Sequence, residues 1–310
     1  MNQWITVLQI IAPIFVAVGL GVLAKRRNLI RAEQMQGLQQ YVMKFGLPCV
    51  LFNSCYGASI SGESLATMVM TAGLVFGGCA WAFSAGKKRF PYHNFPMMFS
   101  SQETGMLGIP LYITLFGVEH AYRIGVMDVA QSVLVAIPCI AILAADTGKN
   151  PSVGEIAEKV VQSPLLIMSV IGLTLNLSGA AVWLNAVGVG GIITEVTGFI
   201  SQPVSAAMLF SVGYNFSLQK GSRSTIFRIA AIHFTLFVVF CGIMQSVLLL
   251  LGNVEAETRW AVLLYCLLPC SYLSPSLGRN EEEYTIASGV CSVLTVISLA
   301  AFCAMATVVA

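Results

Sequence analysis

Residues 94–117 read NFPMMFSSQETGMLGIPLYITLFG, and this stretch decides how the rest of the chain is interpreted. It has the length of a membrane span, yet Gly105, Gly108 and Pro110 lie in its middle together with Glu103. Every backbone polar group inside a bilayer needs a partner, so glycines and a proline at mid-span indicate a helix that breaks beside a cavity. The stretch therefore predicts a broken transmembrane helix next to a polar site.

The composition places the rest of the chain in a membrane as well. Of 310 residues, 57% are hydrophobic and 10% are charged, whereas soluble domains carry about 25% charged residues. So few charges cannot cover a globule, and a net charge of +2 suggests no nucleic-acid partner. The nine cysteines lie in apolar stretches without metal-ligand spacing, so we expect packing roles, no metal and no cofactor.

Apolar segments of about 20 residues, the length that a bilayer requires, recur along the whole chain. They lie at 5–24, 36–57, 65–85, 94–117, 124–145, 163–179, 190–216, 226–251, 259–278 and 285–308. Basic residues follow the first segment rather than precede it, so it is a span and not a cleaved signal peptide. We expect an all-α membrane protein with ten transmembrane helices.

The placement of lysine and arginine predicts the orientation. Alternating the connecting segments between two sides puts Arg123 and Arg259 on one side and leaves Lys44 within a span. The other side receives thirteen basic residues: Lys25, Arg26, Arg27, Arg31, Lys87, Lys88, Arg89, Lys149, Lys159, Lys220, Arg223, Arg228 and Arg279. Basic loops stay in the cytoplasm. We therefore expect a multi-pass protein of the cell inner (cytoplasmic) membrane with both termini outside.

The spans divide into two halves of five. Residues 1–145 form the first half, 146–162 a cytoplasmic linker and 163–310 the second half. Because five is odd, the second half enters the membrane from the opposite side, which makes the halves candidates for inverted repeats. Proline positions support this, with Pro48 matching Pro203 and Pro110 matching Pro269.

The ninth span repeats the interruption of the fourth. Pro269 and Pro275 enclose Ser271, Tyr272 and Ser274. Two broken helices that cross present free N–H groups and positive dipole ends, an arrangement that suits a bound anion. The candidate substrate-binding residues flank the breaks or lie near the prolines of spans 2 and 7: Gln102, Glu103, Thr104, Gly105, Pro110, Pro269, Ser271, Tyr272, Ser274, Pro275, Asn53 and Gln202.

Four segments resemble the auxin efflux carrier family, whose bacterial relatives are commonly described as malate or malonate permeases. Residues 105–111, GMLGIPL, resemble the family's Gly-Phe-Leu-Gly-Ile-Pro segment, and residues 47–52, LPCVLF, its Leu-Pro-Ala-Leu-Leu-Phe. Residues 208–213 and 268–276 are similar to its seventh-span segment and ninth-span break. The resemblance implies a bile-acid-symporter-like fold with a scaffold (spans 1, 2, 6, 7) and a transport domain (spans 3–5, 8–10). It also implies elevator-type motion and a homodimer.

Glu103 departs from the family, which usually has asparagine before this Thr-Gly. A carboxyl group at mid-membrane favours its neutral form, so one hypothesis is that Glu103 couples proton movement to anion movement. Alternatively, Glu103 binds a cationic substrate or Na⁺, or it forms a salt bridge with Lys44. Glu103, Asp128 and Lys44 are the candidates for proton or ion coupling, and His233 is either a proton relay or a packing residue.

These observations together predict a secondary transporter of small organic anions, such as mono- or dicarboxylates, driven by an ion gradient. No His-Glu-x-x-His pair, Gly-x-Ser-x-Gly elbow or phosphate-binding loop occurs in the sequence, so we do not expect an enzyme. A sodium- or cation-coupled carrier of another metabolite, a channel and a membrane sensor are the alternatives.

Overall fold

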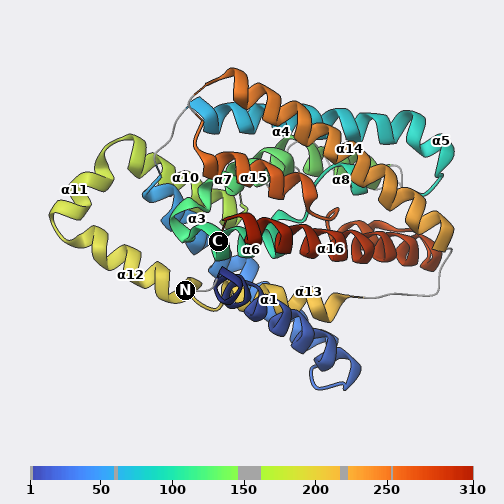
Figure 1. Ribbon diagram of the computed structural model, residues 1–310, viewed down its shortest axis with the longest axis horizontal. Coiled ribbons are helices and arrows are strands. Elements are labelled where there is room, and N and C mark those ends of the chain that lie inside the picture. Colours follow the sequence, from blue (N-terminus) through green and yellow to red (C-terminus); the bar gives the residue numbers. More distant parts are fainter. Residues whose placement is uncertain (1–2, 59–61, 146–161, 217–222, 253, 310) are drawn as a thin grey trace.

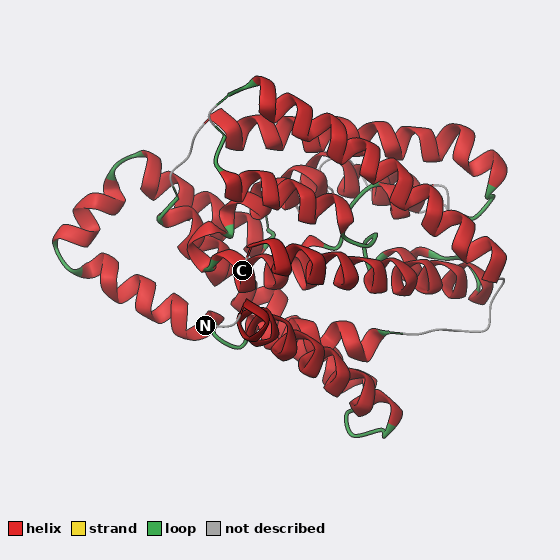
Figure 2. Ribbon diagram, in the orientation of Figure 1, coloured by secondary structure: helices red, strands yellow, loops and turns green. Residues whose placement is uncertain are grey.

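The computed structural model describes residues 3–58, 62–145, 162–216, 223–252 and 254–309, and within them the ordered elements are helices (Figures 1 and 2). The predicted linker 146–162 lies almost entirely outside the described residues. Helices of the first half are α1 (Gln3–Arg26), α2 (Ala32–Tyr41), α3 (Leu47–Tyr56), α4 (Gly62–Trp81), α5 (Lys87–Arg89), α6 (Ile109–Phe116), α7 (Tyr122–Gln131) and α8 (Ile137–Ala145). Short π- or 3₁₀-helical turns join or precede several of them: η1 (Val42–Gly46), η2 (Ala82–Gly86), η3 (Pro96–Phe99), η4 (Thr104–Gly108), η5 (Val118–His120) and η6 (Ser132–Ala136).

The second half continues the helical pattern. Its elements are α10 (Pro164–Leu177), α11 (Ala180–Ala186), α12 (Val189–Ser201), α13 (Val204–Asn215), α14 (Arg223–Leu250), α15 (Ala256–Leu267), η7 (Ser274–Leu277) and α16 (Glu281–Val309). The chain bends by 80° between α10 and α11, where Gly179 has a positive φ of 74° that only glycine adopts without strain.

The helical segments confirm an α-helical, multi-pass membrane protein. Within the described residues, six helical segments are long and apolar enough to span a bilayer, or seven with the bent α10–α11 pair. The segments around 94–117 and 259–278 do not contribute continuous helices because both are interrupted. Ten spans in two inverted repeats therefore stay a prediction.

The helices pack in two groups, one along the left and lower parts of the view in Figure 1 and the other in its upper and right parts. In one group α1 packs on α13, and α3 packs on α10 and α12. In the other group α4 packs on α7, and α14 packs on α15 and α16. Contacts of α13 with η4 and α6 connect the groups. The interrupted segments thus lie where the two groups meet.

An ion-pair network, buried apart from Glu255, joins the starts of α4, α7 and α15. Arg123, only 4% exposed, contacts Glu63 at 3.0 Å and also pairs with Glu255. Thr258 accepts from Arg123 over 2.6 Å and donates to Glu63 over 3.0 Å. The charge distribution predicts Arg123 in a loop between spans, whereas the structure buries it at a helix start. The network connects three helix starts. Removing one partner of a buried ion pair destabilises a fold by about 3–5 kcal/mol, so the pair of Arg123 and Glu63 stabilises this packing.

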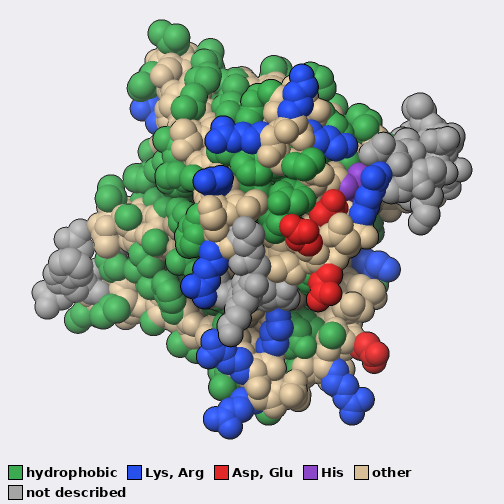
Figure 3. Space-filling model, turned by 90° about the vertical axis from the view of Figure 1, so that its right-hand side faces the viewer, with side chains coloured by type: hydrophobic (Ala, Val, Ile, Leu, Met, Phe, Trp, Pro, Cys, Tyr) green, Lys and Arg blue, Asp and Glu red, His purple; other side chains and the backbone are tan. Residues whose placement is uncertain are grey.

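Much of the outer surface is apolar. Large side chains such as Leu8, Phe76 and Phe199 are exposed by 62%, 63% and 74%, as expected where lipid replaces water. Figure 3 views the right-hand end of Figure 1, where Lys and Arg side chains gather with a few acidic ones. The end of α1 and the short helix α5 supply basic residues there.

Candidate functional site

The two interrupted segments cross in the interior. Gln102 and Cys270 form an isolated antiparallel bridge. The Glu103 N–H donates to the Pro269 carbonyl over 2.8 Å, and the Ser271 N–H donates to the Ser101 carbonyl over 3.1 Å. Extended backbone is tolerated in a membrane only where such partners exist. Each break therefore satisfies part of the other's backbone.

Gln131, from the end of α7, holds the crossing from behind. Its side-chain oxygen accepts from the Gln102 N–H over 2.7 Å and from the Tyr265 hydroxyl over 2.6 Å. Its nitrogen donates to the Gln102 carbonyl, to Thr104 Oγ1 and to Asp128 Oδ1, over 2.9, 2.7 and 3.0 Å. A buried amide with this many partners fixes the position of the first break.

Glu103 lies at the front of the crossing and is half-buried. Its Oε1 accepts from the Met106 N–H over 3.3 Å, which caps the start of η4. Its Oε2 accepts from the Tyr272 N–H over 2.7 Å. One carboxylate thus receives an N–H group from each interrupted segment.

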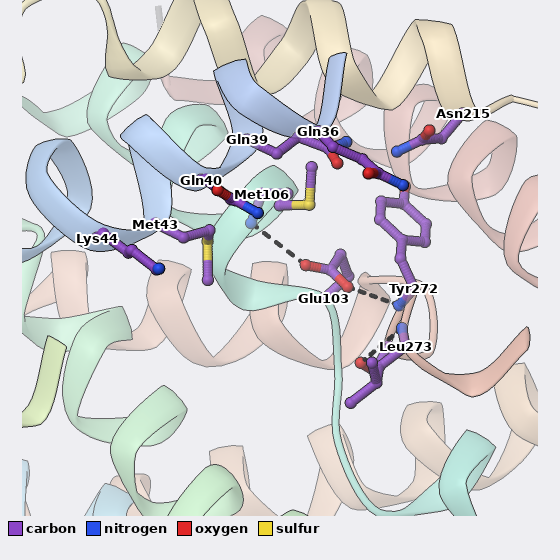
Figure 4. A pocket seen from close by; sticks show the side chains of 11 residues that line it. Gln36, Gln39, Gln40, Met43, Lys44, Glu103, Met106, Asn215, Tyr272 and Leu273 are labelled. Atoms are coloured by element: carbon purple, nitrogen blue, oxygen red, sulfur yellow. Dashed lines mark hydrogen bonds between the residues drawn. The ribbon is translucent and has the colours of Figure 1, made fainter. Parts of the chain in front are cut away.

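A pocket of about 500 Å³ opens in front of Glu103 (Figure 4). Its walls come from α2, η1, the end of α13 and the two breaks, and its lining residues are Gln36, Gln39, Gln40, Met43, Lys44, Glu103, Met106, Asn215, Ser271, Tyr272 and Leu273. A second cavity of about 530 Å³ shares Gln36, Gln39, Asn215, Tyr272 and Leu273 with it. This cavity continues to Lys25, Phe216 and Tyr284, at the basic end of the molecule.

The amide side chains that line the pocket are not among the substrate-binding residues predicted from the sequence. Gln36, Gln39 and Gln40 enter the pocket together because their i, i+3, i+4 spacing places them on one face of α2. Asn215 ends α13 on the other wall. The spacing of the glutamines is the signal in the sequence from which this polar wall could be predicted.

The predicted substrate-binding residues are divided by the structure. Glu103, Ser271 and Tyr272 line the pocket, and Pro275 lines the second cavity. The other predicted residues are not among the described residues that line either cavity. They are Gln102, Thr104, Gly105, Pro110, Pro269, Ser274, Asn53 and Gln202.

Asn53 and Gln202 do not line either cavity. The side chain of Asn53 accepts a hydrogen bond from Thr197, so it is directed towards α12. Gln202 is exposed at the end of α12. The prolines that suggested these positions are helix starts: Pro48 stands in the first turn of α3, and Pro203 precedes α13.

The predicted coupling residues occupy different positions. Lys44 lies in the pocket with Glu103, but the ion pairs found among the described residues do not join these two side chains. Asp128 is buried behind the crossing, against Gln131. His233, 1% exposed, stacks on Phe237 with ring centroids 4.5 Å apart, which is a packing arrangement.

Comparison with known proteins identifies relatives along nearly the whole chain. The family described as "Membrane transport protein" matches residues 6–299. An uncharacterized transporter of the archaeon Methanothermobacter thermautotrophicus is 23% identical over 271 residues, which cover 82% of this chain and 86% of that protein. The interrupted helices and their pocket fall within the matched region.

Proposed function

The chain belongs to the membrane transport protein family, the family of the auxin efflux carriers, and we propose that it is a secondary transporter of small carboxylate-bearing metabolites. The observation that carries this proposal is the pocket in front of the crossed breaks. It holds Lys44 as a partner for a carboxylate, together with four amide side chains. A polar pocket between interrupted helices is where secondary carriers bind substrate.

The two helix groups suggest how the pocket changes sides. We propose that the group containing α1, α3, α10, α12 and α13 is the scaffold and that the group containing α4, α7, α14, α15 and α16 moves as the transport domain. The pocket lies between them, lined by α2 and α13 on one side and by the breaks on the other. With the basic end in the cytoplasm, as proposed from the charge distribution, this conformation is open to the inside. A homodimer formed by scaffolds belongs to the same proposal.

Exchange in proteoliposomes tests the function. Vesicles containing the purified protein and loaded with unlabelled substrate are expected to accumulate labelled substrate transiently and saturably, under imposed proton, sodium or voltage gradients. Gln39→Leu removes an amide that lines both cavities, and we expect it to raise the half-saturating concentration about two- to tenfold, the effect of one lost hydrogen bond.

Gln9→Leu is the matched control, because Gln9 is exposed on α1, away from both cavities. Flux that does not saturate and shows no counterflow would identify a channel instead. Equal kinetics of the two leucine variants would place the substrate outside this pocket.

A further inference from the structure

The anion-binding site expected at the crossing is occupied by a side chain of the protein, the carboxylate of Glu103. From the two helix breaks in the sequence we expect free N–H groups that bind an anion, some from each interrupted segment. Instead, the N–H groups of Met106 and Tyr272 donate to the two carboxylate oxygens of Glu103, over 3.3 and 2.7 Å. Figure 4 shows both hydrogen bonds as dashed lines that converge on this side chain.

This bonding pattern fits an ionised carboxylate. Both oxygens of Glu103 act as acceptors, and an ionised carboxylate has acceptors only. η4 continues into α6, and the start of this helical run, Thr104–Phe116, adds a positive dipole end that stabilises negative charge. A second anion placed against this wall would be repelled by Glu103, whereas a positively charged group would be attracted.

The opposite charge stands elsewhere in the same pocket. Lys44 enters it from η1, with its side chain exposed to the cavity, and is the positive side chain among the described residues that line it. Lys44 and Glu103 do not pair with each other in the described structure. Each is therefore open to a ligand group of opposite charge, and the amides of Gln36, Gln39 and Gln40 offer both donors and acceptors.

We infer that the substrate is a small zwitterion of the amino-acid type, whose ammonium group binds Glu103 and whose carboxylate binds Lys44. A simple mono- or dicarboxylate leaves Glu103 without a partner and brings a like charge towards it. A pocket of about 500 Å³ accommodates a molecule of this size with some water. The inference rests on the proposed function and narrows its substrate class.

Paired compounds that differ by one amino group provide the test. The pairs are succinate with aspartate, butanoate with 2-aminobutanoate, and butanoate with 4-aminobutanoate. Each is offered to proteoliposomes of the wild-type protein in counterflow, and its binding is measured separately as a shift of the melting temperature in detergent. We expect at least one amino compound to be exchanged and bound at least about tenfold better than its partner, the effect of a charge-assisted hydrogen bond.

Three variants assign the preference to the charges. Glu103→Gln is expected to abolish the preference for the amino member of the pair. Lys44→Met is expected to weaken both members and to leave their ratio unchanged. Glu33→Gln is the matched control, because Glu33 stands in the first turn of α2 but outside the pocket lining, and it is expected to behave as wild type.

The outcomes distinguish a failure of the zwitterion inference from a failure of the proposed transport function. Counterflow of succinate or butanoate at least as strong as that of the amino compounds overturns the zwitterion and leaves the transporter intact. Exchange of no compound overturns both. If Glu103→Gln does not fold, the binding and exchange ratios of the wild-type protein still decide between the two substrate classes.

Discussion

At the scale of single residues, Gln131 and Glu103 have different roles at the crossing of the two interrupted segments. Gln131 faces the interior and bonds to Gln102, Thr104, Asp128 and Tyr265, whereas Glu103 faces the pocket. The first residue keeps the broken backbone in place, and the second presents charge to the cavity. Replacing one should therefore affect stability, and replacing the other should affect substrate preference.

Gln131→Leu is expected to destabilise the protein strongly. Several buried groups would lose their partner, and each costs about 1–3 kcal/mol when left unsatisfied. Gln245→Leu is the matched control, because Gln245 donates one side-chain hydrogen bond, to the Arg259 carbonyl over 2.8 Å. Melting temperatures in detergent should fall much further for Gln131→Leu. Similar melting temperatures of the two variants would contradict the role given to Gln131.

At the scale of elements, α1 and α13 approach each other through glycines. A Cβ at Gly21 would lie 2.0 Å from the Phe210 carbonyl oxygen, and one at Gly213 would lie 1.9 Å from the Val18 carbonyl oxygen. Small residues allow backbones to pack closely in membranes, where no hydrophobic force drives helices together. These two glycines therefore hold together the group of helices that we propose as the scaffold.

Gly21→Val should separate α1 from α13, because the added atoms meet backbone that cannot turn aside. We expect a loss of stability of about 1–3 kcal/mol or more, as for other overpacked contacts. Gly19→Val is the control on the same helix, since no atom lies within 4 Å of a Cβ there. Thermal unfolding of the two purified variants compares them. A stable Gly21→Val protein would mean that this close packing is dispensable.

At the scale of the whole molecule, the charges at one end predict its orientation and the side to which the pocket opens. Ser276 lines the second cavity towards the basic end, and Ser178 lies after α10 at the opposite end by the predicted topology. Both are exposed. The native cysteines are buried, apart from the half-buried Cys303, so the wild-type protein serves as the blank for thiol labelling.

A membrane-impermeant maleimide should label Ser178→Cys in intact cells and Ser276→Cys in inverted membrane vesicles. The positive-inside rule is the physical reason, because basic loops are retained in the cytoplasm. Quantifying label on the purified protein is the measurement. The reverse pattern would invert the topology, and labelling of both positions from one side would contradict the predicted number of spans.

The sequence by itself determined the membrane environment, the helical class and the places where helices break. These properties depend on composition and on glycine or proline effects that act within a few residues. Residues 94–117 and 268–277 could therefore be recognised as interruptions, with Glu103, Ser271 and Tyr272 at the candidate site. The family of transporters was recognisable for the same reason, since its motifs coincide with these breaks.

Only the tertiary structure decided which groups meet. Glu103 and Tyr272 are 169 residues apart in the chain, and no local pattern could tell that the N–H groups expected to hold a substrate anion bind this carboxylate instead. The packing of helices distant in the chain brings Asn53 into a hydrogen bond with Thr197 and Arg123 into an ion pair with Glu63. Hydrogen bonds and ion pairs act over a few ångströms, so their partners are set by how helices pack and not by their order along the chain.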